Sequence, residues 1–111
     1  MILSPRAQKL AALAQAKYLR SLPEKKARIA HVWIAIQRHG WTPELSARLK
    51  TEVHWLSGSA GSYGFSALGQ AAQKLDALLA DGIEIRHAGS GFDDVMAALL
   101  REFDQVIDPL H

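Results

Sequence analysis

The chain has 111 residues and a mass of 12.2 kDa, a length that suits one helical domain and is short for two. Hydrophobic residues make up 49% and charged residues 22%, which is typical of a folded domain and excludes a disordered or low-complexity chain. Thirteen basic against eleven acidic residues leave a net charge of +2, too small an excess to indicate nucleic acid as a partner.

The absence of cysteine excludes a disulfide framework, a thiolate nucleophile and thiolate metal ligands. The first residues lack the basic segment and apolar run of a secretory signal, so a cytoplasmic location is expected. A stretch without Asp, Glu, Lys or Arg runs from Val53 to Gln73, but glycines and serines interrupt it. This composition is too polar for a membrane span, and no membrane partner is expected.

A first helix is predicted from Ser4-Pro5 to about Arg20, because serine caps and proline suits the first turn. The residues that recur at helical spacing along it form a narrow face: Leu10, Leu13, Ala14 and Lys17. We expect this short helix to lie across one end of the domain.

A second helix is predicted from Ser21 to Gly40. Ser21 and Glu24 have the spacing of a capping box, and Pro23 falls in the first turn, where its missing N–H costs nothing. Its apolar side follows: Ile29, Val32, Trp33 and Ile36.

The next two helices form a predicted antiparallel hairpin. Thr42-Pro43-Glu44 starts the first of them, and a tight corner over residues 62–66 uses the backbone freedom of Gly64. The apolar face before the corner comprises Leu45, Leu49, Val53, Leu56, Ala60 and Tyr63. The face after the corner comprises Leu68, Ala71, Ala72, Leu75, Leu78 and Leu79, and ends at Asp81-Gly82.

Residues 83–91 are predicted to be a loop, and a last helix follows it. Ser90, with Asp93 and Asp94, is expected to cap this helix, and Pro109 ends it. Its apolar stripe is the strongest in the chain: Phe92, Val95, Met96, Leu99, Leu100, Phe103, Val106 and Ile107. The pattern predicts an all-α, monomeric domain over residues 1–111, an up-and-down antiparallel four-helix bundle (21–108) with an additional N-terminal helix (5–20).

His54 points away from the apolar face of its helix. At about 100° per residue, the imidazole lies well over a quarter turn from the core direction. Its neighbours on that side are small or polar: Ala47, Lys50, Thr51, Ser57, Gly58 and Gly61. Glycine inside a helix costs up to about 1 kcal/mol relative to alanine, so Gly58 and Gly61 indicate a need for close approach to the ring. The alternatives are an ordinary solvated histidine, and glycines that allow helix packing or fraying.

The remaining histidines show no metal-ligand spacing with one another or with acids, and no metal site is predicted. They are interpreted as structural or surface residues: His31, His39, His87 and His111. Trp55 projects away from both the core and His54, so it is expected to cover a flank of the bundle.

The segment from His54 to Phe65 reads HWLSGSAGSYGF. A histidine, an apolar residue two positions later, glycine four positions later, small residues and then Tyr63-Gly64 resemble the central motif of histidine-containing phosphotransfer (HPt) domains. The resemblance extends over most of residues 21–108, and its specific part lies within 51–79. One position departs from the pattern, because many members carry lysine three residues after the histidine and this chain has Ser57.

This resemblance implies a four-helix bundle and a role as phosphorelay intermediate. His54 would take a phosphoryl group from an aspartyl phosphate of a response-regulator receiver domain, or of a hybrid sensor histidine kinase, and pass it on. Imidazole is largely neutral and nucleophilic at neutral pH. Lys50 and Ser57 would support the phosphoryl group, with Lys50 supplying the charge of the missing lysine. The residues for access and docking would be Ala47, Thr51, Gly58 and Gly61.

No ATP-binding motif is present, so the chain is expected to be a phosphoryl carrier with no ATP site of its own. It is expected to bind no cofactor, while the partner receiver domain supplies Mg²⁺. The alternative is a degenerate HPt-like module that binds a kinase or receiver domain without carrying phosphate. Ser57 supports that alternative, and the intact His54-x-Leu56-x-Gly58 pattern argues against it.

Overall fold

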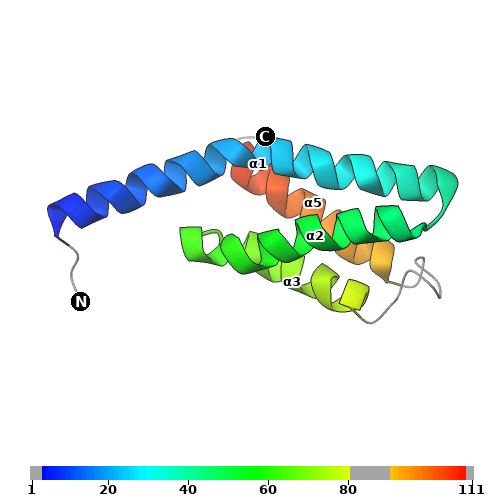
Figure 1. The fold of residues 1–111 in the computed structure, drawn as a ribbon. Coiled ribbons are helices and arrows are strands. Elements are labelled where there is room, and N and C mark those ends of the chain that lie inside the picture. The colour runs from blue at the N-terminus through cyan, green and yellow to red at the C-terminus, as the bar shows by residue number, and fades with distance from the viewer. Residues whose placement is uncertain (1–3, 81–90, 110–111) are drawn as a thin grey trace.

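The computed structural model describes residues 4–80 and 91–109, and these residues form a bundle of helices (Figure 1). The elements are α1 (Pro5–His39), α2 (Pro43–Ser59), the short 3₁₀ helix η1 (Gly61–Tyr63), α3 (Ser66–Ala80) and α5 (Phe92–Ile107). The helix α2 packs against α1 and α3, and α5 packs against α3 and α1. This arrangement confirms the predicted all-α four-helix bundle.

The predicted helix end at Asp81-Gly82, the loop over residues 83–90 and the cap at Ser90 lie outside the described residues, and the residue that precedes α5 is Gly91. Within the described ranges, no helix combines the length and the hydropathy that a membrane crossing requires.

The core is apolar and draws on all four long helices. Its largest fully buried side chains are Phe92, Phe103, Leu22, Ile29, Leu49, Leu56, Leu68, Leu75, Leu79, Met96, Leu99 and Val53. At one end the rings of Trp33 and Trp41 pack on Phe92, with centroids 5.2 and 5.4 Å from the Phe92 ring. The predicted apolar faces of residues 29–36 and 92–107 are therefore confirmed as core-facing.

Three predicted helix boundaries are confirmed by their cap geometry. The side chain of Thr42 accepts a hydrogen bond from the backbone N–H of Leu45 at 3.1 Å. Gly40 ends α1 with a positive φ of 85°, and Gly64 occupies the left-handed region (φ 92°) at the corner before α3. Side chains other than glycine rarely adopt this backbone conformation, which explains glycine at both positions.

The predicted break between the first two helices is wrong, because α1 runs without interruption from Pro5 to His39. The hydroxyl of Ser21 does not cap a helix; it donates to the carbonyl of Tyr18 (2.6 Å) and accepts from Lys25 (2.8 Å). Proline inside a helix lowers stability by about 3 kcal/mol because it removes a backbone hydrogen bond, but its fixed φ is compatible with a helix. Burial of Tyr18 and Leu22 just before Pro23 holds the two segments together.

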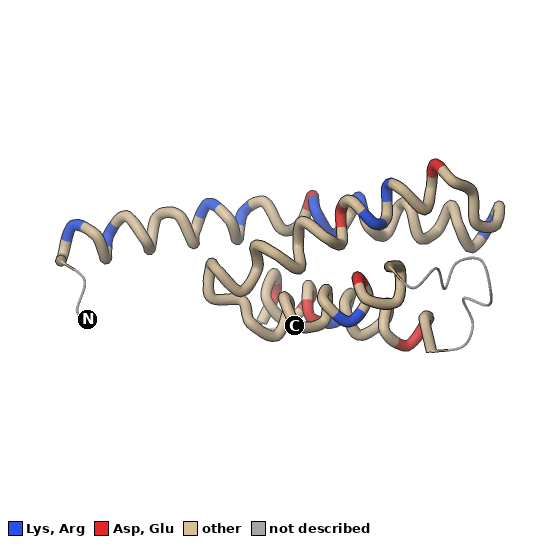
Figure 2. Tube along the Cα trace, turned by 60° about the horizontal axis from the view of Figure 1, so that its bottom comes forward, with Lys and Arg blue, Asp and Glu red and all other residues tan. Residues whose placement is uncertain are grey.

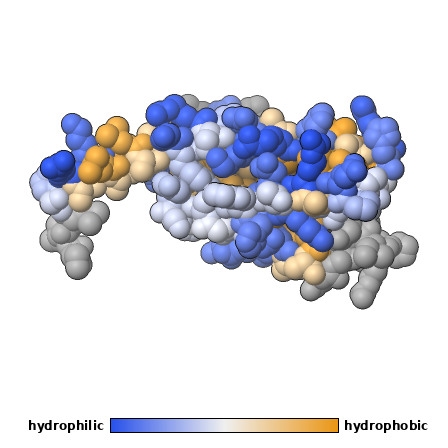
Figure 3. Space-filling view, viewed as in Figure 1, coloured by the Kyte–Doolittle hydropathy of each residue, from blue (hydrophilic) through white to orange (hydrophobic). Residues whose placement is uncertain are grey.

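The additional N-terminal helix is therefore the beginning of α1, and it extends past the bundle instead of lying across its end (Figure 1). Its predicted apolar face is exposed, with Leu10 and Leu13 at 58% and 57% (Figure 3). The chain turns back between α2 and α3 at residues 60–65, and Gln15 and Tyr18 of this segment contact Tyr63 at that corner. The segment carries Lys and Arg but no acidic residue (Figure 2), and the first acidic residue in the sequence is Glu24.

The corner between α2 and α3 also differs from the prediction. The helix α2 ends at Ser59, and Tyr63 belongs to η1, where it is exposed rather than part of the core. Leu45 is also predicted to belong to the core, but it is only half-buried and packs against the edge of the core. Tyr63 instead stacks on Tyr18 of α1, with ring centroids 4.4 Å apart, so it joins the corner to α1.

Deprotonation of Tyr18 at alkaline pH should lower the stability of the folded chain. Burial raises the pKa of its phenol above 10.0, the hydrogen bond to Ser59 (2.7 Å) opposes this shift, and Tyr63 raises the pKa further. The unfolded chain therefore loses this proton at lower pH than the folded chain, so stability is intact below pH 10 and falls as pH rises further.

We expect Tyr18→Phe to lower the free energy of unfolding by about 1 kcal/mol near neutral pH, because one hydrogen bond is lost. Above about pH 10 the difference between the variant and the wild type should narrow, because phenylalanine does not titrate. Urea denaturation at a series of pH values measures this. If the two proteins differed by the same free energy of unfolding at every pH, Tyr18 would not cause the loss of stability at alkaline pH.

Candidate functional site

His54 lies on the solvent side of α2, as its helical direction predicts. Its side chain is 78% exposed, whereas Val53 before it and Leu56 after it are fully buried. The buried neighbours fix the rotation of α2 about its axis, so the outward direction of the imidazole is a consequence of core packing. The predicted site residue is therefore accessible to a macromolecular partner.

The imidazole is held by a residue of the next helix. Nδ1 of His54 lies 3.1 Å from Oδ2 of Asp76 on α3, and the Asp76 side chain is 29% exposed. A carboxylate only accepts hydrogen bonds, so Nδ1 carries the proton in this pair. The other ring nitrogen, Nε2, then bears the free lone pair and is the nucleophilic atom.

Asp76 was not among the residues predicted from the sequence. A signal for it exists, because His54 and Asp76 are each eleven residues from Phe65 at the corner. Residues equidistant from a tight antiparallel corner lie at the same height on the two helices, so a carboxylate at this spacing faces the histidine.

The hydroxyls near His54 bond to backbone carbonyls of their own helix. Ser57 donates to the carbonyl of His54 (2.8 Å), and Thr51 donates to the carbonyl of Ala47 (2.9 Å). To donate to a phosphate oxygen, Ser57 would have to give up this backbone bond. Its predicted role, like that of Lys50 one turn before His54 on α2, stays a prediction.

The glycines beside His54 are not required by packing. A Cβ placed on Gly58 or Gly61 would meet no neighbouring group of the described chain within 4 Å. Gly69 of α3 differs, because a Cβ there would lie 3.2 Å from the backbone nitrogen of Gly61. Close helix packing therefore explains Gly69. The space at Gly58 is open one turn after His54 on α2, whereas Gly61 lies in η1, beyond the end of α2.

Trp55 does not cover a flank of the bundle, contrary to the sequence prediction. Trp55 is 70% exposed, so it covers little of the bundle surface. His31 and His39 are exposed on α1, as predicted, and His87 and His111 lie outside the described residues. Within residues 4–80 and 91–109, no group of three or more acidic or histidine side chains could hold a metal ion.

Comparison with known proteins identifies the family of the chain. No curated protein and no solved structure matches the chain significantly. The family model of the Hpt domain matches residues 7–108, which include all of the described helices except the first two residues of α1. Members of this family carry phosphoryl groups in two-component signalling, where they interact with receiver domains and histidine kinases. Because the match covers nearly the whole sequence, the chain belongs to the Hpt domain family.

Proposed function

We propose that the chain is a phosphorelay intermediate that accepts a phosphoryl group on His54 from an aspartyl phosphate of a receiver domain and passes it to another aspartate. The observation that carries the proposal is the exposed imidazole whose Nδ1 is bound to Asp76, since this leaves Nε2 free toward solvent. A phosphoryl carrier needs such a nucleophile within reach of another protein.

The transfer step follows from this geometry. The Nε2 lone pair forms the new N–P bond while the bond between phosphorus and the aspartate oxygen breaks. That oxygen keeps the bonding electrons, and the donor aspartate leaves as a carboxylate. Nδ1 retains its proton, so the imidazole becomes cationic as the N–P bond forms, and the Asp76 carboxylate 3.1 Å away stabilises that charge.

The surroundings of His54 suit transfer between proteins. In-line attack needs the donor aspartate and its phosphoryl group close to Nε2, and Gly58 leaves that approach open. Lys50 would offset the charge of the phosphoryl oxygens in place of the lysine that many family members carry three residues after the histidine. We propose that Mg²⁺ is supplied by the receiver domain and that this chain binds no cofactor of its own.

The test is phosphoryl transfer from a purified receiver domain that a sensor kinase has labelled with radioactive phosphate. The wild type should gain label that is lost in acid and stable in alkali, as expected for phosphohistidine. His54→Gln should gain none, and His39→Gln, altered at the exposed end of α1, should be labelled like the wild type. Label on His54→Gln would reject the site. A wild-type chain that binds the phosphorylated receiver without gaining label would instead be a binding module.

A further inference from the structure

The most exposed large hydrophobic side chain of the described residues is Trp55, which directly follows His54. The other tryptophans, Trp33 and Trp41, pack with Phe92 at the end of the core. Folding does not need Trp55 in its exposed position, since it contributes little buried area. Tryptophan is among the residues most enriched at the energetic centres of protein interfaces, which points to a partner.

His54 and Trp55 border one open strip of α2. Successive residues differ by about 100° in direction, so His54 turns toward α3, where it meets Asp76, and Trp55 turns toward α1. Gly58 lies one turn further along α2, between these two directions, and it adds no side chain to the strip. A surface that reaches Nε2 over Gly58 therefore also meets the indole.

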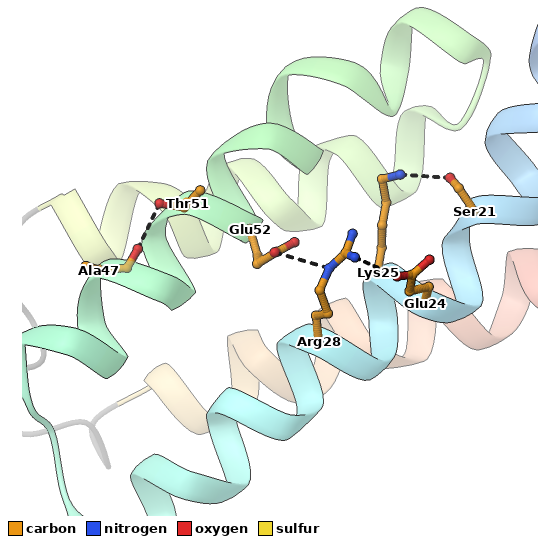
Figure 4. A network of polar contacts seen from close by, with 7 residues as sticks. All are labelled: Ser21, Glu24, Lys25, Arg28, Ala47, Thr51 and Glu52. Carbon is orange, nitrogen blue, oxygen red and sulfur yellow. Dashed lines mark hydrogen bonds and ion pairs between the residues drawn. The ribbon is translucent and has the colours of Figure 1, made fainter.

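A groove with a volume of about 670 Å³ lies along the boundary between α1 and α2, and Trp55 itself is not part of its lining. Thr51 and Glu52 line it one turn before Trp55, and Ala27 and Val32 of α1 contribute apolar surface. Arg28 crosses the groove to Glu52 at 3.2 Å and bonds Glu24 at 2.9 Å (Figure 4). Of these two ion pairs, Arg28–Glu52 joins α1 to α2 across the groove, whereas Arg28–Glu24 lies within α1.

We propose that Trp55, together with the adjoining end of this groove, is the docking anchor for the receiver domain that exchanges phosphate with His54. The inference rests on the proposed function. The occupant follows from continuity, because a specific interface covers about 800 Å² on each partner, and a patch of that size centred on His54 includes the next residue of the helix. Trp55 supplies binding and His54 supplies chemistry, so their substitutions have different kinetic signatures.

The experiment measures transfer from the same labelled receiver domain over a range of receiver concentrations. Trp55→Ala should raise the KM by about tenfold or more while leaving the rate at saturation close to that of the wild type. Trp55→Phe should retain most of the affinity. The matched control is Leu10→Ala, since Leu10 is similarly exposed but lies on α1 beyond the end of the bundle, and it should leave the KM unchanged.

A second measurement separates docking from chemistry. Phosphoramidate, a small phosphoryl donor, needs no docking surface, so Trp55→Ala and the wild type should be labelled by it at equal rates. An unchanged KM for the receiver would overturn the proposal for Trp55 while His54 continued to accept phosphate. The proposal would also be overturned if Trp55→Ala were labelled more slowly than the wild type to the same degree by the receiver and by phosphoramidate. Trp55 would then act on the imidazole itself. Absence of label on the wild type with both donors would instead reject the proposed function.

Discussion

Replacing Gly58 by glutamine is expected to slow phosphoryl transfer from a receiver domain to His54 by about tenfold or more, with little loss of stability. Residues four apart on a helix lie on the same face, and long side chains point back toward the preceding turn. Glutamine at this position would therefore extend over the imidazole. Stability should be preserved because a Cβ on Gly58 meets no neighbouring group within 4 Å, and glutamine favours a helix by up to about 1 kcal/mol over glycine.

The matched control for this prediction is Gly58→Ala, which adds a methyl group without the reach of glutamine. It should raise the free energy of unfolding by a few tenths to about 1 kcal/mol and reduce transfer far less. Initial transfer rates and thermal melts of both variants give the comparison. Wild-type transfer by Gly58→Gln would mean that the open space is incidental, and a large drop in its melting temperature would mean that the glycine is structural.

Replacing Asp76 by alanine is expected to slow transfer roughly 10–100-fold, the range found when the carboxylate that orients a metal-bound histidine is removed. Two contributions are lost with the carboxylate: it keeps the proton on Nδ1, and it stabilises the cationic imidazole that forms with the N–P bond. Asp76→Asn should be intermediate, since its side-chain carbonyl still accepts from Nδ1–H but carries no charge.

Single-turnover transfer rates test this prediction, with Asp104→Ala as control. Asp104 is an exposed carboxylate on α5 paired with Lys26, so its removal should change stability by less than about 1 kcal/mol and leave transfer unaffected. The role assigned to Asp76 would be contradicted if Asp76→Ala and Asp104→Ala transferred phosphate equally fast. Nitrogen NMR of the imidazole adds a readout that a merely structural role would not move, because Asp76→Ala should lose the preference for a proton on Nδ1.

Directions within one helix could be predicted from the sequence, whereas relations between helices largely could not. The outward direction of His54 follows from the buried positions of Val53 and Leu56, which the apolar pattern reveals. Asp76 faces His54 across the hairpin, and this contact depends on the height at which α3 passes α2. In the sequence, only the position of the corner indicates this height. The sequence analysis predicts the corner but does not count residues from it along both helices.

The error in α1 has a similar origin. Ser21, Pro23 and Glu24 are good residues for the start of a helix, and local signals alone favour a break there. Tertiary packing overrides them, because Tyr18 and Leu22 are buried in the same core as Ile29. The helical spacing of Leu10 and Leu13 favours a buried face, but both are exposed because the bundle ends before this part of α1. The exposure of Trp55 was missed for the same reason, since its surroundings depend on the separation of α1 and α2.

We propose that the phosphoryl group is carried on Nε2 of His54. Phosphorus and nitrogen NMR of the phosphorylated wild-type chain tests it most directly, because the two ring nitrogens give distinct couplings to phosphorus. We expect one phosphohistidine, at residue 54, with phosphorus on Nε2 and a proton on Nδ1. Phosphorus on Nδ1, or on any other residue, would contradict it.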